Sequence, residues 1–371
     1  MLTPRENLLR TFRHEEPEWV PVIALGDGYN RPAHMPSSFY EDERRMTVSR
    51  ALSRYFGLDV LDRIGGWEER YHDVGYSRSV EDGLERQCWE TPYGTITASR
   101  QEVRYPSAPG EPELVTSFPV EYPLKSAADY RAFAYIFEHL EYVFHLEQIE
   151  AKVREVGEEG IVTIGAPSSP LGMCVRLYAG VQHLAYAFSD HRQELGRLLE
   201  TIAEKNYECY QRIANLPVDG TINYDDTTTY AISPAMFRDL ELPYLRRTAE
   251  VLHQAGKLCI HHACGHIAAL LPDLAQAGID GLDGPALPPV GDTSVSMARR
   301  GFGEEIVIMP FLEQTAIESG DYGVIRSSVR QVFAEAGSHR AFVFDVVPPP
   351  AAPVESLWAA VEEAKRLSSR H

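Results

Sequence analysis

The chain lacks any long uninterrupted run of apolar residues, and none approaches the roughly 18 residues that a membrane-spanning helix requires. Its start, Met1 to Glu6, is polar and does not contain the apolar segment of a secretory signal. Basic residues are also scarce: 35 Lys and Arg stand against 54 Asp and Glu, a formal net charge of −19. Duplex-binding proteins usually carry a basic face. We therefore expect a cytoplasmic protein that binds neither membrane nor nucleic acid.

Cysteine is sparse as well, with five residues in 371: Cys88, Cys174, Cys209, Cys259 and Cys264. An odd count in a long chain without a secretory signal argues against a disulfide framework. A cysteine in such a chain is expected to be buried, metal-bound or catalytic. Cys264 stands out because it lies two residues after His262, at a glycine that ends an apolar run. Cys259 lies inside that run and is expected in the core.

Strands and helices are predicted to alternate along most of the chain. Near-continuous apolar strands separated by helices are typical of a parallel sheet covered by helices. The predicted strands begin at eight positions: Val20, Leu58, Ile161, Thr221, Leu258, Ile279, Ile306 and Ala341. This number favours a (β/α)8 TIM barrel, and 371 residues suit one such barrel of roughly 250 residues with an insertion. We predict a single domain over residues 1–371.

The insertion is expected at about residues 67–113. From Trp67 to Tyr105 the residues alternate, and Pro92 to Thr95 forms a turn signal, which indicates antiparallel β-hairpins. The Pro- and Gly-containing stretch 106–113 is predicted to be a loop. Together they would form a flap over the barrel. Residues 127–156, which follow, are predicted to be helical.

Chemistry in a barrel of this type lies at the carboxyl ends of the strands. The predicted fourth strand ends at Asp225 and Asp226, which we consider as catalytic groups, metal ligands or substrate anchors, or as a cap for the following turn. The fifth ends at His262-Ala263-Cys264. Imidazole and thiolate are the ligands that zinc prefers. A zinc site here needs a further ligand from another strand end.

Asp345 and Glu313 are the best candidates for that ligand, with Asp226 third. The alternative is that the histidines of this strand only hydrogen-bond to the backbone, which is the role we favour for His261 and His266. The ligands expected for a zinc site are therefore His262 and Cys264, with Asp345 or, less favoured, Glu313.

The chain resembles the uroporphyrinogen decarboxylase superfamily along most of its length. The resemblance is carried by four segments: Thr3–Glu6 with Trp19–Val22, Asp225–Asp226 with Ser233–Pro234 and Leu242–Tyr244, the His262-x-Cys264-Gly265 turn, and Pro348–Pro349 with Pro353–Glu355. The resemblance implies a (β/α)8 barrel, in agreement with the predicted strands. True decarboxylases of the superfamily carry an Arg-Gln-Ala-Gly-Arg motif that grips the substrate carboxylates. Residues 26–32 here read Gly-Asp-Gly-Tyr-Asn-Arg-Pro and lack it.

A second branch of the superfamily consists of zinc-dependent methyltransferases that work with corrinoid proteins. They use a His-x-Cys pair and a cysteine on the last strand. His262 and Cys264 match this pattern, whereas Asp345 stands in the region of the last cysteine. The resemblance thus implies methyl transfer between a small substrate and a corrinoid protein or a thiol, with Zn²⁺ as the metal. The alternatives are a metal-independent decarboxylase that uses Asp225 or Asp226, and a non-catalytic protein that binds a ligand or a corrinoid protein.

Overall fold

A computed structural model of the protein describes residues 2–27, 29–105, 113–225 and 227–368. It has the predicted α/β class, with a parallel sheet whose strands are joined by helices. The first helix, α1 (Pro4–Phe12), begins as the sequence predicts. The Thr3 hydroxyl accepts from the Glu6 backbone N–H, the Glu6 carboxylate accepts from the Thr3 N–H, and Pro4 occupies the first helical position.

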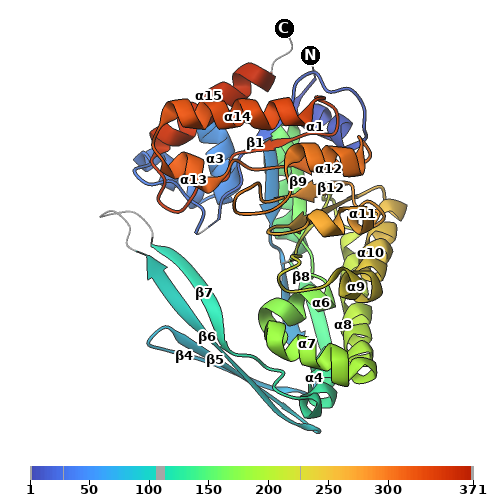
Figure 1. Ribbon diagram of the computed structural model, residues 1–371. Helices are drawn as coiled ribbons and strands as arrows, with labels where there is room; N and C mark the ends of the chain where they lie inside the picture. The colour runs from blue at the N-terminus through green and yellow to red at the C-terminus, as the bar shows by residue number, and fades with distance from the viewer. Residues whose placement is uncertain (1, 28, 106–112, 226, 369–371) are drawn as a thin grey trace.

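A six-stranded parallel sheet forms the centre of the molecule, in the order β13-β12-β11-β10-β9-β2 (Figure 1). Its strands are β2 (Val60–Ile64), β9 (Gly160–Gly165), β10 (Gly220–Asp225), β11 (Leu258–Ala263), β12 (Gly281–Asp283) and β13 (Val307–Met309). Each of these strands begins within two residues of a predicted strand start. Two glycines permit the closest approaches, since a Cβ at Gly160 or Gly220 would collide with the backbone of the neighbouring strand.

The first and last predicted strands form a parallel pair of their own, β1 (Val22–Ile23) with β14 (Phe344–Asp345). Parallel bridges from Ile308 to Phe342 and from Phe311 to Asp345 connect the segment around β14 with that around β13. On the other side, the Asp59 N–H donates to the Val22 carbonyl at 3.0 Å, next to β2. The β1–β14 pair therefore has contacts with both edges of the six-stranded sheet, which is strongly curved.

Side chains alternate between the two faces of this curved sheet. Ile23, Leu61, Ile222, Ile260 and Val343 belong to one fully buried cluster on the concave side, which Leu8 and Phe12 of α1 close at one end. Residues of the opposite parity, such as Cys259 and Ala263, pack under the helices in a second cluster. Strand parity therefore decides whether a residue faces the interior or the helical layer.

The helices surround the sheet, as Figure 1 shows. Besides α1 they are α2 (Ser37–Glu43), α3 (Val48–Phe56), α4 (Tyr130–Glu138), α5 (Leu146–Val156), α6 (Pro170–Met173), α7 (Gly180–Asp190), α8 (Arg192–Ile213), α9 (Pro234–Met236), α10 (Leu242–Gln254), α11 (Leu271–Leu274), α12 (Val295–Phe302), α13 (Gln314–Glu318), α14 (Tyr322–Ala336) and α15 (Val354–Ser368). Short 3-10 or π segments are η1 (Ala127–Asp129), η2 (Gly157–Glu159), η3 (Cys174–Tyr178), η4 (Phe237–Glu241) and η5 (Ala268–Leu270). Among the helices of the described ranges, none is long and apolar enough to cross a membrane.

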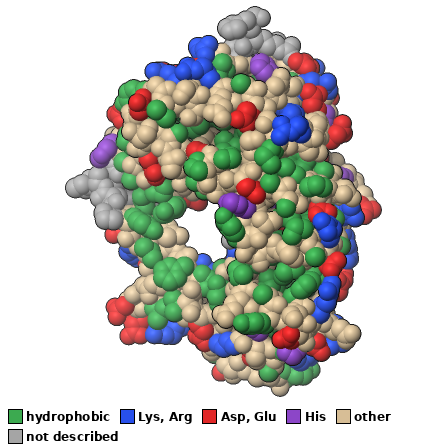
Figure 2. Space-filling model, viewed as in Figure 1, with side chains coloured by type: hydrophobic (Ala, Val, Ile, Leu, Met, Phe, Trp, Pro, Cys, Tyr) green, Lys and Arg blue, Asp and Glu red, His purple; other side chains and the backbone are tan. Residues whose placement is uncertain are grey.

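An antiparallel sheet projects from the body as an arm, formed by β4 (Gly75–Glu81), β5 (Leu84–Thr91), β6 (Gly94–Tyr105) and β7 (Leu114–Glu121). The arm begins at Gly75, later than the predicted start at residue 67, and ends at Glu121, beyond the predicted limit at residue 113. Residues 106–112 of the predicted loop lie outside the described ranges. Figure 2 shows an opening between the arm and the body. The rings of Tyr105 and Tyr29 contact each other with centroids 5.4 Å apart, so the arm's end meets the loop after β1.

One predicted helical segment contains a strand. Within residues 127–156, β8 (Leu140–Phe144) lies between α4 and α5 and pairs antiparallel with β3 (Trp67–Tyr71). The partner strand is about seventy residues away in the sequence, so local helical propensity did not reveal the pairing. The helical prediction for this strand was wrong.

Candidate active site

A cavity of about 500 Å³ lies at the carboxyl ends of the parallel strands. Its lining includes His262, Cys264 and Asp345, three of the residues that the sequence predicted for a metal site. Further polar side chains come from Asp27, Asn30, Arg63, Tyr224, Asp283 and Gln314, and apolar ones come from Leu25, Ile64, Ile222, Phe311 and Val347. Glu313, the less favoured ligand, lines a separate cavity with Leu287, Ser294 and Glu335.

The polar side chains reach the cavity because of their strand parity. His262 follows the interior residue Ile260 by two positions, and Asp345 follows Val343 in the same way. Arg63 and Tyr224 likewise follow Leu61 and Ile222. In each of these strands an apolar residue fills the concave face of the sheet. The residue two positions later points to the same side and lines the cavity.

His262 is held by Asp283, with 2.6 Å between the imidazole Nδ1 and the carboxylate Oδ2. Gly284, with φ +71°, leaves room for the ring, since a Cβ there would lie 2.5 Å from His262 Cε1. Burial alone would lower the pKa of His262, but hydrogen bonds to Asp283 and to the Cys264 thiol raise it to about 10. The imidazole therefore has Asp283 on one nitrogen and Cys264 beside it.

Arg63 is the counter-ion that keeps Asp283 charged. Its Nη2 lies 2.9 Å from Asp283 Oδ1, and its Nη1 donates to the Tyr224 hydroxyl at 2.5 Å. Burial alone would raise the pKa of Asp283, but the charges of Arg63 and His262 lower it below its ordinary value. The sequence analysis assigned no role to Asp283, Arg63 or Tyr224. Arg63 could have been found because it is a charged residue in β2 that points to the same side as the buried Leu61.

Asp345 faces the same cavity from β14. Its Oδ1 accepts from the Leu25 N–H at 3.0 Å, whereas Oδ2 is buried and has no hydrogen-bond partner among the described residues. Burial raises the pKa of Asp345 well above its ordinary value, and the charge of Asp283 raises it further. Asp345 is thus a carboxyl group with one oxygen available for a further contact.

Asp225, a predicted catalytic residue, has the opposite parity and does not line this cavity. It is fully buried, and its Oδ1 accepts from the Ser169 N–H at 2.9 Å and from the Ser169 hydroxyl at 3.1 Å. Its Oδ2 accepts from Asn223 Nδ2 at 3.2 Å. Asp226 lies outside the described residues. The predicted role of the two aspartates stays a prediction.

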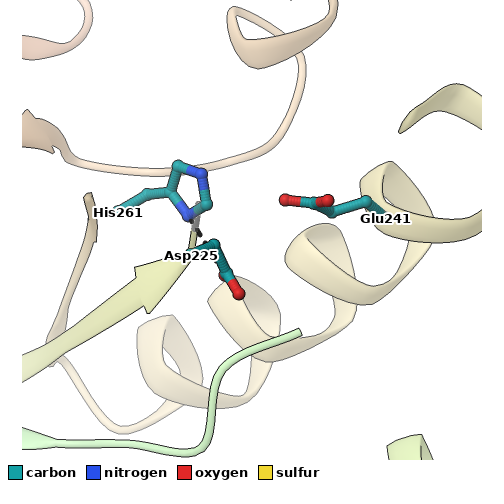
Figure 3. Close-up of side chains that lie close together, drawn as sticks. All are labelled: Asp225, Glu241 and His261. Carbon is teal, nitrogen blue, oxygen red and sulfur yellow. Dashed lines mark ion pairs between the residues drawn. The ribbon is translucent and has the colours of Figure 1, made fainter. Parts of the chain in front are cut away.

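Asp225 belongs to a second group of ionisable side chains, shown in Figure 3 with Glu241 and His261. The three residues are fully buried. Among the described residues, this is the group of three or more His, Cys, Asp or Glu side chains whose ligand atoms all lie within 4.8 Å of one another. Burial lowers the pKa of His261 to about 3, and burial together with the charge of Asp225 raises the pKa of Glu241. Glu241 lies in a continuous helical stretch without a sequence motif and was not predicted.

An α/β fold with a polar cavity at the carboxyl ends of a curved parallel sheet is an arrangement typical of barrel-type enzymes. The family model for uroporphyrinogen decarboxylase (URO-D) matches residues 111–367. The chain therefore belongs to the uroporphyrinogen decarboxylase family, and the resemblance that its motifs indicate is confirmed. A search of curated proteins finds no match to the chain.

Among solved structures, a methyltransferase from Methanosarcina mazei is similar over 99% of each chain, with a TM-score of 0.64 and 14% sequence identity. A B12-independent methionine synthase from Shewanella sp. W3-18-1 is similar over 94% of this chain and 97% of its own, with a TM-score of 0.49 and 10% identity. The first of these similarities supports the α/β fold and its barrel-like arrangement.

Proposed function

We propose that the protein is a methyltransferase that moves a methyl group between a small substrate and a corrinoid protein or thiol, at a divalent-metal site containing His262 and Cys264. The observation that carries this proposal is the His262–Asp283 hydrogen bond in the cavity, beside the Cys264 thiol. A carboxylate on one imidazole nitrogen orients the other nitrogen toward a metal, as in carboxylate–histidine–zinc arrangements.

The donor set fits Zn²⁺, which accepts nitrogen, sulfur and carboxylate oxygen in one site. His262 and Cys264 are already in contact, and Asp345 offers the buried oxygen Oδ2, which has no hydrogen-bond partner among the described residues. The ligand atoms of the three residues do not all lie within 4.8 Å of one another in the described chain, so the side chains would have to move together around the ion. We propose these three residues as the ligands, with Asp345 in the place of a third thiolate. Zinc would supply a thiolate nucleophile near neutral pH, because it lowers the pKa of a bound thiol.

The remaining cavity residues would position the reactants. Asp283 holds the His262 ring, and Arg63 holds Asp283 in its charged form. Tyr224 is 37% exposed and its ring centroid lies 5.2 Å from that of His262, so its ring would contact a substrate bound beside His262. The apolar lining from Leu25, Ile64 and Phe311 would exclude water from the methyl group during transfer.

We also propose that the eight parallel strands form a closed barrel, and that the arm of β4–β7 covers the substrate or receives the corrinoid protein. The contacts of the β1–β14 pair with both edges of the six-stranded sheet support closure. The contact between Tyr105 and Tyr29 supports the role of the arm, because Asp27 and Asn30 next to Tyr29 line the cavity.

Charge argues against a substrate with many carboxylates. Of the described residues that line the cavity, Arg63 is the only Arg or Lys, and it is already paired with Asp283. Asp27, Asp283 and Asp345 are on the same lining. A polycarboxylate would meet more negative than positive charge.

Metal content and methyl transfer test the proposal together. Purified protein should contain Zn²⁺ by elemental analysis and should consume methylcobalamin in the presence of a small thiol, followed by the change in its absorption spectrum. His262→Ala should abolish methyl transfer and remove the zinc bound in the cavity, while His253→Ala, which removes a half-exposed histidine paired with Asp280, should preserve both. Full activity of the His262→Ala variant would contradict the proposal. Chelator-insensitive decarboxylation of a porphyrinogen would instead establish the decarboxylase alternative.

A further inference from the structure

We propose that Asp225, Glu241 and His261 bind a second, structural divalent metal ion, behind the wall of the cavity. The three side chains converge from three elements: Asp225 ends β10, His261 lies in β11, and Glu241 lies at the junction of η4 and α10. Figure 3 shows the Glu241 carboxylate directed toward the other two. One ligand atom from each residue lies within 4.8 Å of the others, so shifts of up to about 1.5 Å would bring them to the spacing of roughly 3.3–3.6 Å that bonds of about 2.0–2.2 Å around a zinc ion imply.

The second observation is an oxygen without a partner. Glu241 is fully buried, and its Oε2 has no hydrogen-bond partner in the described chain. Its Oε1 accepts from the Thr227 hydroxyl at 2.9 Å, and no Lys or Arg of the described residues forms an ion pair with it. A buried carboxylate without a cation is strongly unfavourable. A metal ion would satisfy Oε2 and balance the charge.

The hydrogen-bond partners of His261 determine which of its two ring nitrogens is free to bind a metal ion. Asn223 Nδ2 donates to Asp225, so its Oδ1, 3.1 Å from His261 Nδ1, requires that nitrogen to carry the hydrogen. His261 Nε2 then holds the lone pair. Thr227 lies 3.3 Å from Nε2 and 2.9 Å from Glu241, but its single hydrogen serves one of them. A cation between Nε2 and Glu241 would satisfy the acceptor that the Thr227 hydrogen does not reach.

The donor set identifies the class of ion. One imidazole and two carboxylates suit a first-row divalent metal such as Zn²⁺ or Mn²⁺, and Thr227 supplies a neutral oxygen nearby. The site is closed, since all four residues are buried, which is typical of a structural and not a catalytic metal. Bound there, the ion would tie α10 to β10 and β11, whose interior residues Tyr224 and His262 line the cavity.

The experiment separates this site from the one in the cavity. Protein is produced in zinc-supplemented medium, dialysed against metal-free buffer and analysed for zinc. The double variant His262→Ala/Cys264→Ala should retain one equivalent of zinc per chain, and Glu241→Gln should lose one equivalent relative to the unaltered protein. Glu250→Gln, at an exposed position of the same helix, is the matched control and should lose none.

Thermal unfolding gives an independent reading. If the ion is present, Glu241→Gln should lower Tm, and added zinc should raise the Tm of the double variant but not that of Glu241→Gln. The inference is overturned if the double variant contains no zinc and Glu241→Gln matches or exceeds the stability of the unaltered protein. That result would show that Glu241 is protonated and donates to Thr227. If only the proposed cavity site were absent, the unaltered protein and the double variant would contain the same amount of zinc, and Glu241→Gln would remove it.

Discussion

The Nδ1 of His262 and the Oδ2 of Asp283 are 2.6 Å apart, across the register pair that joins β11 to β12. The two residues are direct neighbours in the sheet and share the face that lines the cavity. Because Asp283 is itself bonded to Arg63, the imidazole is fixed in one orientation before any ligand binds. This chain of contacts organises the cavity and defines where substitutions should have the largest effects.

Asp283→Asn should weaken metal binding at His262 by about 10- to 100-fold, because it removes the charged partner that orients the imidazole. Methyl transfer should fall by a comparable factor, whereas the fold should persist. Metal titration with a competing chelator measures the affinity. Asp239→Asn, which breaks an exposed pair with Arg192, provides the control. Equal metal affinity in both variants would rule out the orienting role of Asp283.

Gly284→Ala should displace the His262 ring and abolish activity. The added Cβ would lie 2.5 Å from Cε1, and φ at this position is +71°. Gly256→Ala is a close control, since φ is +68° there and nothing lies within 4 Å of the added Cβ. Both variants should lose about 1–2 kcal/mol of stability from the left-handed backbone. Only Gly284→Ala should lose activity, and an active Gly284→Ala variant would refute the expected displacement.

Arg63→Met should destabilise the protein by about 3 kcal/mol, because it leaves the buried carboxylate of Asp283 without its guanidinium partner. Adding Asp283→Asn should recover part of this loss, since it removes the uncompensated charge. Urea unfolding of the two variants measures the difference. Arg54→Met, at a side chain that is 63% exposed, should change stability by less than about 1 kcal/mol. No recovery in the double variant would show that Arg63 acts through packing alone.

Iodoacetamide should modify Cys264 and Cys88 but spare the other three cysteines of the native protein. Cys174, Cys209 and Cys259 are buried, and burial raises the pKa of Cys174 to about 12 and those of the other two thiols still further. Added Zn²⁺ should protect Cys264 but not Cys88. Peptide mass spectrometry after brief labelling gives the outcome. Labelling of Cys264 that zinc does not slow would argue against its role as a ligand.

Stability should depend on pH through Asp59, which accepts from the Val22 N–H at 3.0 Å and from Trp19. Burial raises the pKa of Asp59 to about 6, so its neutral form is favoured in the folded state. The resulting stabilisation of the folded protein is present at low pH and is lost as pH rises through about 6. The free energy of unfolding of the unaltered protein minus that of Asp59→Asn should therefore decrease by about 2 kcal/mol from pH 4.5 to 7.5.

Denaturant unfolding at several pH values checks this dependence. Asp190→Asn, which removes an exposed carboxylate, serves as the control and should show no comparable trend. A difference between Asp59→Asn and the unaltered protein that is constant over the pH range would contradict the prediction.

Local signals in the sequence were enough for the alternating elements and for part of the site. Continuous apolar runs marked the strands, and the capping box marked the start of α1. The His262-x-Cys264 spacing located one wall of the cavity, because two residues of the same strand parity necessarily face one side. The same rule also covers the other strands: the residue two positions after the last buried inward-facing residue should line the cavity. It would have indicated Arg63 and Tyr224.

Other features depended on contacts between residues far apart in the chain. The strand β8 exists because it pairs with β3, and no local pattern encodes a partner so distant. The sequence alone determined the order of the parallel strands and most helices, the family and the His-x-Cys pair, since these depend on short-range periodicity and motifs. Only the tertiary structure decided that Asp283 holds His262, that Arg63 holds Asp283, and that Asp225 joins Glu241 and His261 behind the cavity, because burial and pairing arise where separate strands meet.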